Sequence, residues 1–489
     1  MITLILQGHP FAYEMENLCR VFFPSQRILV QEQLPADGDA VVTSLREEGG
    51  EVTVTARLVR EGEEKALSHT ISAAAGYGER QRQMGVLLYR LLSEQLGTYP
   101  QWGILTGVRP IKLFRGLCQE QGEEAAVQIF RDQLLVSPEK TALSLQTARA
   151  QQKILSVSGP RSFSLYLSIP FCPSRCSYCS FVSQSVERAK KLIQPYVDLL
   201  VKEIAITARI ADQLGLKLET VYVGGGTPTT LSPEQLRVMI GAVRQNFNMD
   251  TVREFTVEAG RPDTITAEKL AALREGGVSR ISINPQTLND TVLEQIGRRH
   301  TAQQTFESFA LARDAGFGNI NMDTIAGLPG DTPESFAETF RKLDALRPES
   351  ITVHTLAQKR ASFLNQREDM PGPGDSAAAA EKMVAVAERT LSGAGYAPYY
   401  LYRQSKMLGN LENVGWSLPG FESWYNVYMM EETHTVLACG AGAVTKLKAP
   451  RGEKIERIFN FKYPYEYNSR FDEMAHRKEQ VVAFYEQHQ

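Results

Sequence analysis

The sequence lacks strong charge of one sign and long apolar runs. Its 53 lysine and arginine residues nearly balance 56 aspartate and glutamate residues, so the net charge of −3 gives no electrostatic reason to expect nucleic acid or an anionic membrane as the main partner. No stretch approaches the ~20 apolar residues of a membrane span. The opening MITLILQGHP has neither the basic start nor the long apolar core of a signal peptide. We therefore expect a cytoplasmic protein.

Cysteine is also scarce, with six in 489 residues, but three of the six fall within eight positions. They form the pattern Cys172-x3-Cys176-x2-Cys179 inside YLSIPFCPSRCSYCSFVS. In a reducing compartment, clustered thiols bind metal more often than they form disulfides. The remaining cysteines are scattered singly, at Cys19, Cys118 and Cys439.

A fourth ligand for this cysteine triplet is missing, because the next histidine along the chain is His300. Structural zinc sites usually close with four ligands, so the pattern disfavours zinc. Three thiolates can instead hold three irons of a 4Fe–4S cluster and leave the fourth iron open to another ligand. Zinc and three unliganded cysteines are the less favoured alternatives.

From about residue 163 the pattern alternates between short apolar strands and amphipathic helices. Six strand–helix repeats between about 163 and 356 predict a parallel sheet curled into a partial or full barrel. Before them, strands to about residue 75 are followed by helices, and DMPGPGDSAAAA resembles a linker. We expect an α/β protein with three domains: an N-terminal α+β domain (1–158), a (β/α)6 core (159–368) and a C-terminal accessory domain that covers the substrate (369–489).

Glycine or polar residues end several of the expected strands. They are the glycines of YVGGGTPT, Glu258 of FTVEAG, Gln286 of SINPQT and Asp323 of NMDTIAGLPG. Each alone would more often be a turn or a solvated strand end. In a parallel barrel, however, the carboxyl ends of the strands meet on the face that carries chemistry. Consecutive glycines there let the backbone approach a ligand closely. The four in register predict a site on that face.

Taken together, the motifs resemble the radical S-adenosylmethionine (SAM) superfamily, in which the open iron of the cluster binds SAM. Within it, YLSIPFCPSRCSYCSF, GGGTPT, NPQT and the GLPG segment resemble the oxygen-independent coproporphyrinogen III dehydrogenase family over about residues 160–360. TGVRP upstream and YYLYRQSKMLGNLENVGW downstream resemble its HemZ branch, over nearly the whole chain. The resemblance implies a partial (β/α)6 radical SAM barrel whose 4Fe–4S cluster is held by the three clustered cysteines.

The resemblance also implies a SAM pocket. The glycine motif would lie at the methionine end, Tyr178 beside the adenine, and Glu258 at the ribose hydroxyls. The residues implied for this pocket are Tyr166, Tyr178, Gly225, Gly226, Thr227, Glu258, Gln286, Arg298 and Asp323.

The activity implied is that of an oxidoreductase of heme biosynthesis, which turns two propionates of coproporphyrinogen III into the vinyl groups of protoporphyrinogen IX. The partners implied are this or another tetrapyrrole and a flavodoxin-like or ferredoxin-like electron donor, and we expect a monomer. Propionates favour bidentate arginine. Arg261, Arg360 and Arg403 are the candidates.

Some positions depart from the family pattern. Phe181 stands where the dehydrogenases have a further cysteine, and Ser168 where they usually have histidine. Tyr425 and Asn426 are the nearest match to the His–Asn pair of the heme-chaperone branch. One alternative is therefore a heme carrier without porphyrinogen turnover, for which His354 is a candidate ligand. Another is a radical SAM methyltransferase or other tetrapyrrole-modifying enzyme.

Overall fold

The chain folds into two compact units in this computed structural model. The structure describes residues 1–33, 38–181, 183–357, 373–404 and 406–488. One unit, here called the N-terminal unit, comprises Met1–Ala148, Pro371–Glu381 and Tyr402–Glu412. The other, here called the barrel unit, comprises Arg149–Met370, Lys382–Leu401 and Asn413–Gln489. This division differs from the three expected domains, because two short segments of the C-terminal part fold with the N-terminal unit.

The N-terminal unit contains a five-stranded sheet in the order β2-β1-β3-β4-β5. On β4, the alternate residues Val52, Val54, Ala56 and Leu58 are buried, as expected for a strand with one covered face. Helix α2 packs on β4 and β5. The strands are β1 (Ile2–Gln7), β2 (Ile28–Gln31), β3 (Asp39–Glu48), β4 (Glu51–Arg60) and β5 (Glu63–Ser72). The helices are α1 (Ala12–Phe22), α2 (Tyr77–Leu96), α3 (Pro110–Gln121), α4 (Glu123–Gln128), η1 (Ile129–Gln133) and α5 (Pro138–Leu155), which runs on into the barrel unit.

A buried carboxylate ties segment 402–412 to the rest of the N-terminal unit. Glu412 accepts a hydrogen bond from Trp102 Nε1 at 2.7 Å and forms an ion pair with Lys140 Nζ at 2.6 Å. All three side chains are buried, so each charge is compensated where water does not reach. The loop WGILTGVRPIKLF, which contains Trp102, therefore has a packing role.

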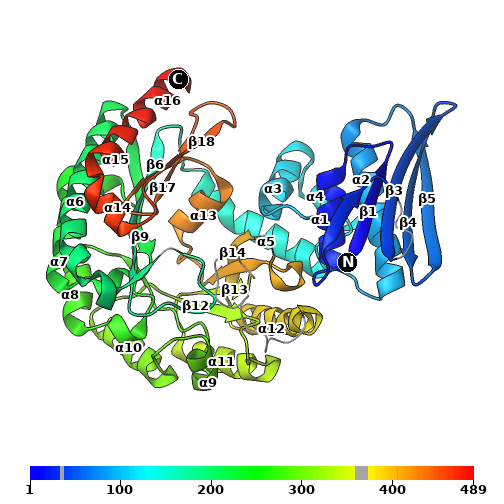
Figure 1. Ribbon diagram of the computed structural model, residues 1–489. Helices are drawn as coiled ribbons and strands as arrows, with labels where there is room; N and C mark the ends of the chain where they lie inside the picture. The colour runs from blue at the N-terminus through cyan, green and yellow to red at the C-terminus, as the bar shows by residue number, and fades with distance from the viewer. Residues whose placement is uncertain (34–37, 182, 358–372, 405, 489) are drawn as a thin grey trace. The chain divides into compact units, whose positions relative to one another are not determined.

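The barrel unit is built on six parallel strands, whose order in the sheet follows their order along the chain. Helices α6, α7, α8 and α10 follow one another around the outside of these strands (Figure 1). The strands are β6 (Ser162–Ile169), β9 (Lys217–Gly225), β10 (Glu254–Glu258), β11 (Arg280–Ser282), β12 (Ile320–Ala326) and β13 (Ser350–Thr355). The helices are α6 (Val186–Gln213), α7 (Pro233–Asn246), α8 (Ala267–Glu275), α9 (Asp290–Gln295), α10 (Ala302–Asp314) and α11 (Pro333–Leu346). The expected partial (β/α)6 barrel is confirmed.

Strands from the C-terminal part extend this sheet at both edges. β15 pairs antiparallel with β13 at one edge, and β16 pairs parallel with β6 at the other. The full order is β14-β15-β13-β12-β11-β10-β9-β6-β16-β17-β18. An open barrel has two unpaired edges, and these strands cover them. The added strands are β14 (Ala397–Tyr402), β15 (Asn413–Ser417), β16 (Thr435–Cys439), β17 (Val444–Lys448) and β18 (Ile455–Phe459).

The helices of the C-terminal part pack partly on the barrel's own helices. Glu203 of α6 is fully buried, accepts hydrogen bonds from Tyr467 Oη and the Gly440 amide, and forms an ion pair with Lys478 Nζ at 2.8 Å. The C-terminal part is therefore integrated with the barrel in this region. The helices are α12 (Pro373–Gly393), α13 (Trp424–Glu431), α14 (Pro464–Ser469), α15 (Phe471–Arg477) and α16 (Glu479–His488).

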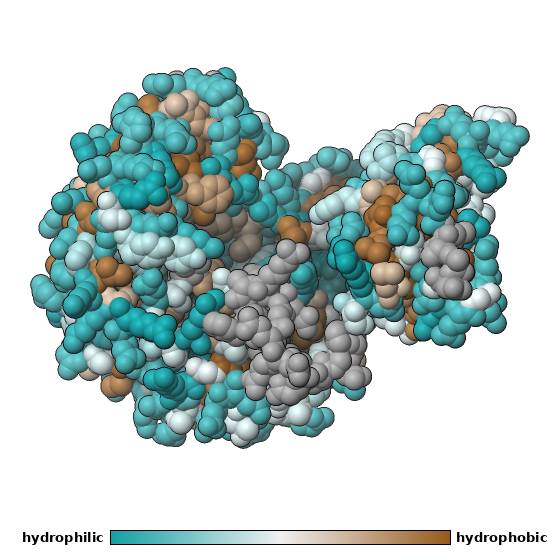
Figure 2. Space-filling view, in the orientation of Figure 1, coloured by the Kyte–Doolittle hydropathy of each residue, from teal (hydrophilic) through white to brown (hydrophobic). Residues whose placement is uncertain are grey.

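The surface is mostly polar on the face that can be seen in the space-filling view. Hydrophilic residues predominate on the face shown in Figure 2, and the apolar residues visible there form small separate patches. Among the described residues, no helix combines the length and the apolar character that crossing a bilayer requires.

Candidate functional site

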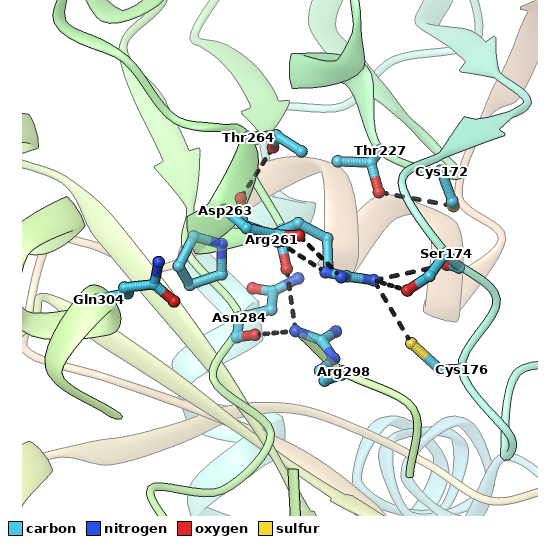
Figure 3. Close-up of polar contacts among 12 residues, drawn as sticks. Cys172, Ser174, Cys176, Thr227, Arg261, Asp263, Thr264, Asn284, Arg298 and Gln304 are labelled. Carbon is cyan, nitrogen blue, oxygen red and sulfur yellow. Dashed lines mark hydrogen bonds and ion pairs between the residues drawn. The ribbon is translucent and has the colours of Figure 1, made fainter. Parts of the chain in front are cut away.

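The cysteine triplet lies on a loop that follows β6 at the carboxyl end of the barrel. The loop is closed at its base by a short parallel pair, β7 (Phe171–Cys172) with β8 (Gln184–Ser185). Its start is held by the next strand's end, because the amides of Gly226 and Thr227 donate to the carbonyls of Ile169 and Phe171 at 2.8 and 2.7 Å. The Thr227 hydroxyl also donates to Cys172 Sγ at 3.5 Å (Figure 3).

The three thiols of this loop are shielded from water to different degrees. Cys176 is buried, and Cys172 and Cys179 are half-buried. Burial raises the pKa of the Cys172 thiol, and it raises the pKa of Cys179 to about 11. Thiols bind metal as thiolates, so metal binding here must release protons.

A site for a single metal ion is one use that a protein makes of clustered thiols. Among the described residues, no three histidine, cysteine or acidic side chains converge on one ion position. An iron–sulfur cluster makes a different demand, because each of its cysteine ligands binds a separate iron. Three cysteines can therefore serve a cluster without meeting at one point.

Gly225 and Gly226 bring the end of β9 directly against the cysteine loop. A Cβ atom on Gly226 would lie 2.6 Å from the Phe171 carbonyl oxygen and 3.0 Å from Cys172 Sγ. Gly225 has a φ of +105°, in the region that favours glycine, and a Cβ there would lie 2.9 Å from Ser168 Oγ. The sequence predicted that these glycines let the backbone approach a ligand. The structure shows that they also allow the end of β9 to lie against the cysteine loop.

Glu258 ends β10 and points into a group of aromatic rings. Its Oε1 accepts a hydrogen bond from Tyr222 Oη at 2.7 Å. Burial raises the pKa of Glu258 to about 7, although the Tyr222 hydroxyl opposes this rise. The Tyr222 ring stacks on Tyr425 with 4.4 Å between centroids, and Tyr166 lies 6.2 Å from Tyr222. A carboxyl placed in this way can exist in either protonation state near neutral pH.

Tyr425 comes from α13, so the C-terminal part contributes a side chain to the interior of the barrel. The sequence drew attention to Tyr425 only as a near match to a chaperone motif, and it gave no role to Tyr222. The available signal for Tyr222 was its place on β9, two residues before Gly224, on the same face of the strand.

Gln286 and Asp323 meet where the chain leaving β11 passes β12. The Gln286 amide donates to the Asp323 carbonyl at 2.9 Å, and Gln286 has a φ of +69°, rare for a residue with a side chain. Its buried Oε1 has no hydrogen-bond partner among the described residues. Backbone strain and unsatisfied buried polar atoms are found more often at functional positions than elsewhere.

Asp323 is placed beside a histidine that the sequence had assigned only to the heme-carrier alternative. His354 Nε2 lies 3.7 Å from Asp323 Oδ2, and Asn321 Nδ2 donates to Oδ1 at 2.7 Å. Burial acts to raise the pKa of Asp323, but the contacts from His354, Asn321 and Thr352 outweigh it and hold this pKa below its usual value. Asp323 is therefore an anion at neutral pH.

Arg298 supports the cysteine loop from the opposite side. Its Nη1 donates to the carbonyls of Asn284 and Gly260, at 2.5 and 3.2 Å, and its Nε donates to Tyr178 Oη at 3.3 Å. Arg298 is buried. The structure thus brings Tyr178 and Arg298 together, as two of the residues expected at one pocket.

Two of the three arginines expected to bind substrate lie among the described residues. Arg261 is buried and ion-paired with Asp263, with its remaining nitrogen facing the cysteine loop. Arg403 is buried in the N-terminal unit, where Nη1 donates to the Leu105 carbonyl at 2.7 Å. Both guanidinium groups are buried, and substrate binding by either of them stays a prediction. Arg360 lies outside the described residues.

The two positions that depart from the family pattern also have definite surroundings. The side chain of Phe181 is 65% exposed, so it does not pack beneath the cysteine loop. Ser168 is buried and donates to the Ala441 carbonyl at 2.8 Å, in the turn that follows β16. Ser168 thus contacts the turn that follows the strand added at this edge.

The pKa of Glu258 predicts a pH-dependent stability. Between pH 4.5 and 7 the native carboxyl retains a proton that the unfolded chain has released, so the free energy of unfolding falls as pH rises, by up to about 1.4 kcal/mol per pH unit. Glu258→Gln should remove this loss. Denaturant unfolding should show the variant gaining stability relative to the wild type between pH 5 and 7, whereas Glu307→Gln, at an exposed position on α10, should show no such gain. If the free energy of unfolding changed with pH in the same way in wild type and Glu258→Gln, the raised pKa of Glu258 would be contradicted.

Comparisons with known proteins agree with this geometry. Residues 166–343 match the family model of the Radical SAM superfamily. The chain is 34% identical over 485 residues to the oxygen-independent coproporphyrinogen-III oxidase-like protein HemZ of Bacillus subtilis, which covers 97% of this chain and 95% of that protein. It is 38% identical over 204 residues to the heme chaperone HemW of B. subtilis, covering 41% of this chain and 52% of the relative. Among solved structures, coproporphyrinogen III oxidase (HemN) from Escherichia coli aligns with a TM-score of 0.52 and 26% identity, over 67% of this chain and 73% of that one.

Proposed function

The chain belongs to the radical SAM superfamily and, within it, to the family of oxygen-independent coproporphyrinogen III oxidase-like proteins, and from that premise we propose that it is an oxidoreductase acting on tetrapyrrole propionates. The proposed reaction is the oxidative decarboxylation of two propionates of coproporphyrinogen III to vinyl groups. The observation that carries the proposal is Gln286, whose strained backbone and unpartnered buried Oε1 lie beside Asp323 at the strand ends.

The residues present fit the cofactors that the superfamily implies, a 4Fe–4S cluster and SAM. We assign the cluster to Cys172, Cys176 and Cys179, because their loop is held at its base by β7 and β8 and backed by the glycines of β9. The remaining iron would be left for SAM. We assign SAM to the strand ends beside the loop, where the carboxyl groups of Glu258 and Asp323 lie and where the buried Oε1 of Gln286 has no hydrogen-bond partner among the described residues. The residues assigned to SAM are Tyr166, Tyr178, Gly225, Gly226, Thr227, Glu258, Gln286, Arg298 and Asp323.

When bound, the cluster and SAM would supply a radical able to abstract a hydrogen atom from the substrate. The residues of the chain would orient the bound molecules and keep water away from them. Glu258 and Asp323 offer carboxylate oxygens that can accept hydrogen bonds from hydroxyl or amino groups. The stacked rings of Tyr166, Tyr222 and Tyr425 line the interior beside Glu258 and exclude water from it.

A heme-carrier function is the second candidate, favoured by the HemW relatives. The two candidates differ in what becomes of the tetrapyrrole. A carrier would bind heme and leave coproporphyrinogen III unchanged, whereas the oxidoreductase would shorten its propionates.

Product analysis separates these candidates. Protein reconstituted anaerobically with iron and sulfide should be incubated with coproporphyrinogen III, SAM and a low-potential reductant, and the tetrapyrroles should be analysed by mass spectrometry. We expect loss of carbon dioxide at two propionates, and no loss with Cys172→Ala as the matched inactive control. Stoichiometric heme binding with unchanged coproporphyrinogen III would overturn the proposal in favour of the carrier.

A further inference from the structure

Arg261 follows β10 and points back toward the cysteine loop. Its Nε and Nη2 form a bidentate pair with the two carboxylate oxygens of Asp263, each at 2.9 Å (Figure 3). The side chain is only 4% exposed. A bidentate pair fixes the plane of a guanidinium group as well as its position. The third nitrogen, Nη1, is therefore held in one direction.

The Nη1 atom of Arg261 points toward the loop that carries the cysteines. Arg261 Nη1 lies 3.1 Å from Ser174 Oγ, 3.4 Å from the Ser174 carbonyl oxygen and 3.9 Å from Cys176 Sγ. Ser174 is midway between Cys172 and Cys176. Arg261 is the N-cap of the 3-10 turn η4 (Pro262–Thr264), and its carbonyl accepts from Thr264 Oγ1 at 2.8 Å, so the backbone on which it stands is also anchored.

Positive charge exceeds negative charge around Cys176. Arg298 interacts with the Cys176 sulfur as well, so two buried guanidinium groups face this residue. The carboxylate ion-paired with Arg261 is Asp263. Burial and the two arginines lower the pKa of His300 to about 3, so this neighbouring imidazole is neutral. A buried cation without a matching anion is costly, so the arrangement calls for a negative group at the sulfur.

We propose that Arg261 is a positioning residue for the cluster, which holds the cysteine loop through Ser174 and places a positive charge beside Cys176 that raises the cluster's reduction potential. This inference rests on the proposed assignment of the cluster to the three cysteines. Reduction adds one negative charge to the cluster, and a fixed cation nearby stabilises the reduced form more than the oxidised form. Hydrogen bonds to cluster sulfurs act in the same direction.

Opposite charge changes at the pair should shift the potential in opposite directions. Arg261→Gln removes the cation and should lower the equilibrium constant for reduction by at least about tenfold, which corresponds to about 59 mV for a one-electron step. Arg261→Lys keeps the charge and should restore most of this loss. Asp263→Asn removes the anion and leaves the cation less compensated, so it should raise the potential. If Arg261 and Asp263 only supported the fold, the two substitutions would not shift the reduction potential in opposite directions.

The test is a redox titration of the reconstituted full-length protein, followed by the electron paramagnetic resonance signal of the reduced cluster. Arg237→Gln, at an exposed position on α7, is the matched control and should leave the potential unchanged. Equal potentials in wild type and Arg261→Gln, or shifts of the same sign in Arg261→Gln and Asp263→Asn, would overturn the inference. If Arg261→Gln assembles no cluster, the sign of the Asp263→Asn shift decides. A wild-type protein that assembles no cluster would instead overturn the proposed function.

Discussion

Replacing any one of Cys172, Cys176 and Cys179 by alanine is expected to abolish stable cluster assembly. Each thiolate would bind a separate iron, so no neighbouring side chain can take over a lost position without moving the loop. The loop has little freedom to move, because its base is paired through β7 and β8 and backed by Gly226. Iron and sulfide content, with the absorbance of the cluster, should fall to background in all three variants.

The other cysteines provide the matched controls for this prediction. Cys118 is half-buried in α3 of the N-terminal unit, and Cys439 is buried at the end of β16. Cys118→Ala and Cys439→Ala should retain the full iron content. A cluster that survives loss of Cys176 but disappears with Cys118 or Cys439 would show that the ligands have been assigned to the wrong cysteines.

Gly226→Ala is expected to damage the site strongly by adding a methyl group between β9 and the cysteine loop. The new Cβ would lie 2.6 Å from the Phe171 carbonyl oxygen and 2.9 Å from that of Ile169, and both are backbone atoms that cannot rotate away. Overpacking of this kind costs about 1–3 kcal/mol. The cysteine loop would have to shift relative to β9, and a misplacement of ~1 Å at a reacting centre can cost ~100-fold in rate.

The measurements for Gly226→Ala are SAM affinity by equilibrium binding and the rate of reductive SAM cleavage. We expect both to fall, with cleavage reduced by about 100-fold or more. Gly241→Ala is the matched control, because Gly241 lies within α7 and a Cβ there meets nothing within 4 Å. This second variant should be unchanged in activity and, as alanine favours a helix, slightly more stable. Wild-type SAM binding and cleavage in Gly226→Ala would contradict the close approach of β9 to the loop.

The part of the site that depends on strand order was predictable from the sequence. Glu258, Gln286 and Asp323 were expected together because consecutive parallel strands present their carboxyl ends on one face, and alternating strands and helices are visible in the sequence. The structure places Gln286 and Asp323 in backbone contact, as this reasoning requires. The barrel, the cysteine loop and the glycine turn could be located in the same way.

The contributions of the C-terminal part were not predictable in this way. The pairing of β15 with β13 and of β16 with β6 joins residues far apart in the chain, and local periodicity carries no information about such partners. The same limit applies to Tyr425, which reaches Tyr222 only because α13 lies against the barrel. The expected start of the accessory domain was inferred from a Pro- and Gly-rich segment, which marks a break in the chain but not where the following strands will pair.

Arg261 illustrates a different limit. Its place after a strand end correctly put it near the site, and its chemistry suited a propionate. Whether an arginine binds a substrate or stays paired within the protein depends on the anions near it in the fold. Here Asp263, two residues away, accepts hydrogen bonds from two nitrogens of Arg261. A sequence pattern shows both residues but not the geometry that joins them.

The central claim is that this chain uses a SAM-derived radical to begin the decarboxylation of a tetrapyrrole propionate, and isotope transfer tests it most directly. Coproporphyrinogen III deuterated at the propionate carbon next to the macrocycle should be incubated anaerobically with the reconstituted protein, SAM and reductant. The 5′-deoxyadenosine formed should then be isolated and its mass measured. The account predicts one deuterium in this product for each propionate converted. Cleavage of SAM that never places substrate deuterium in 5′-deoxyadenosine would contradict it.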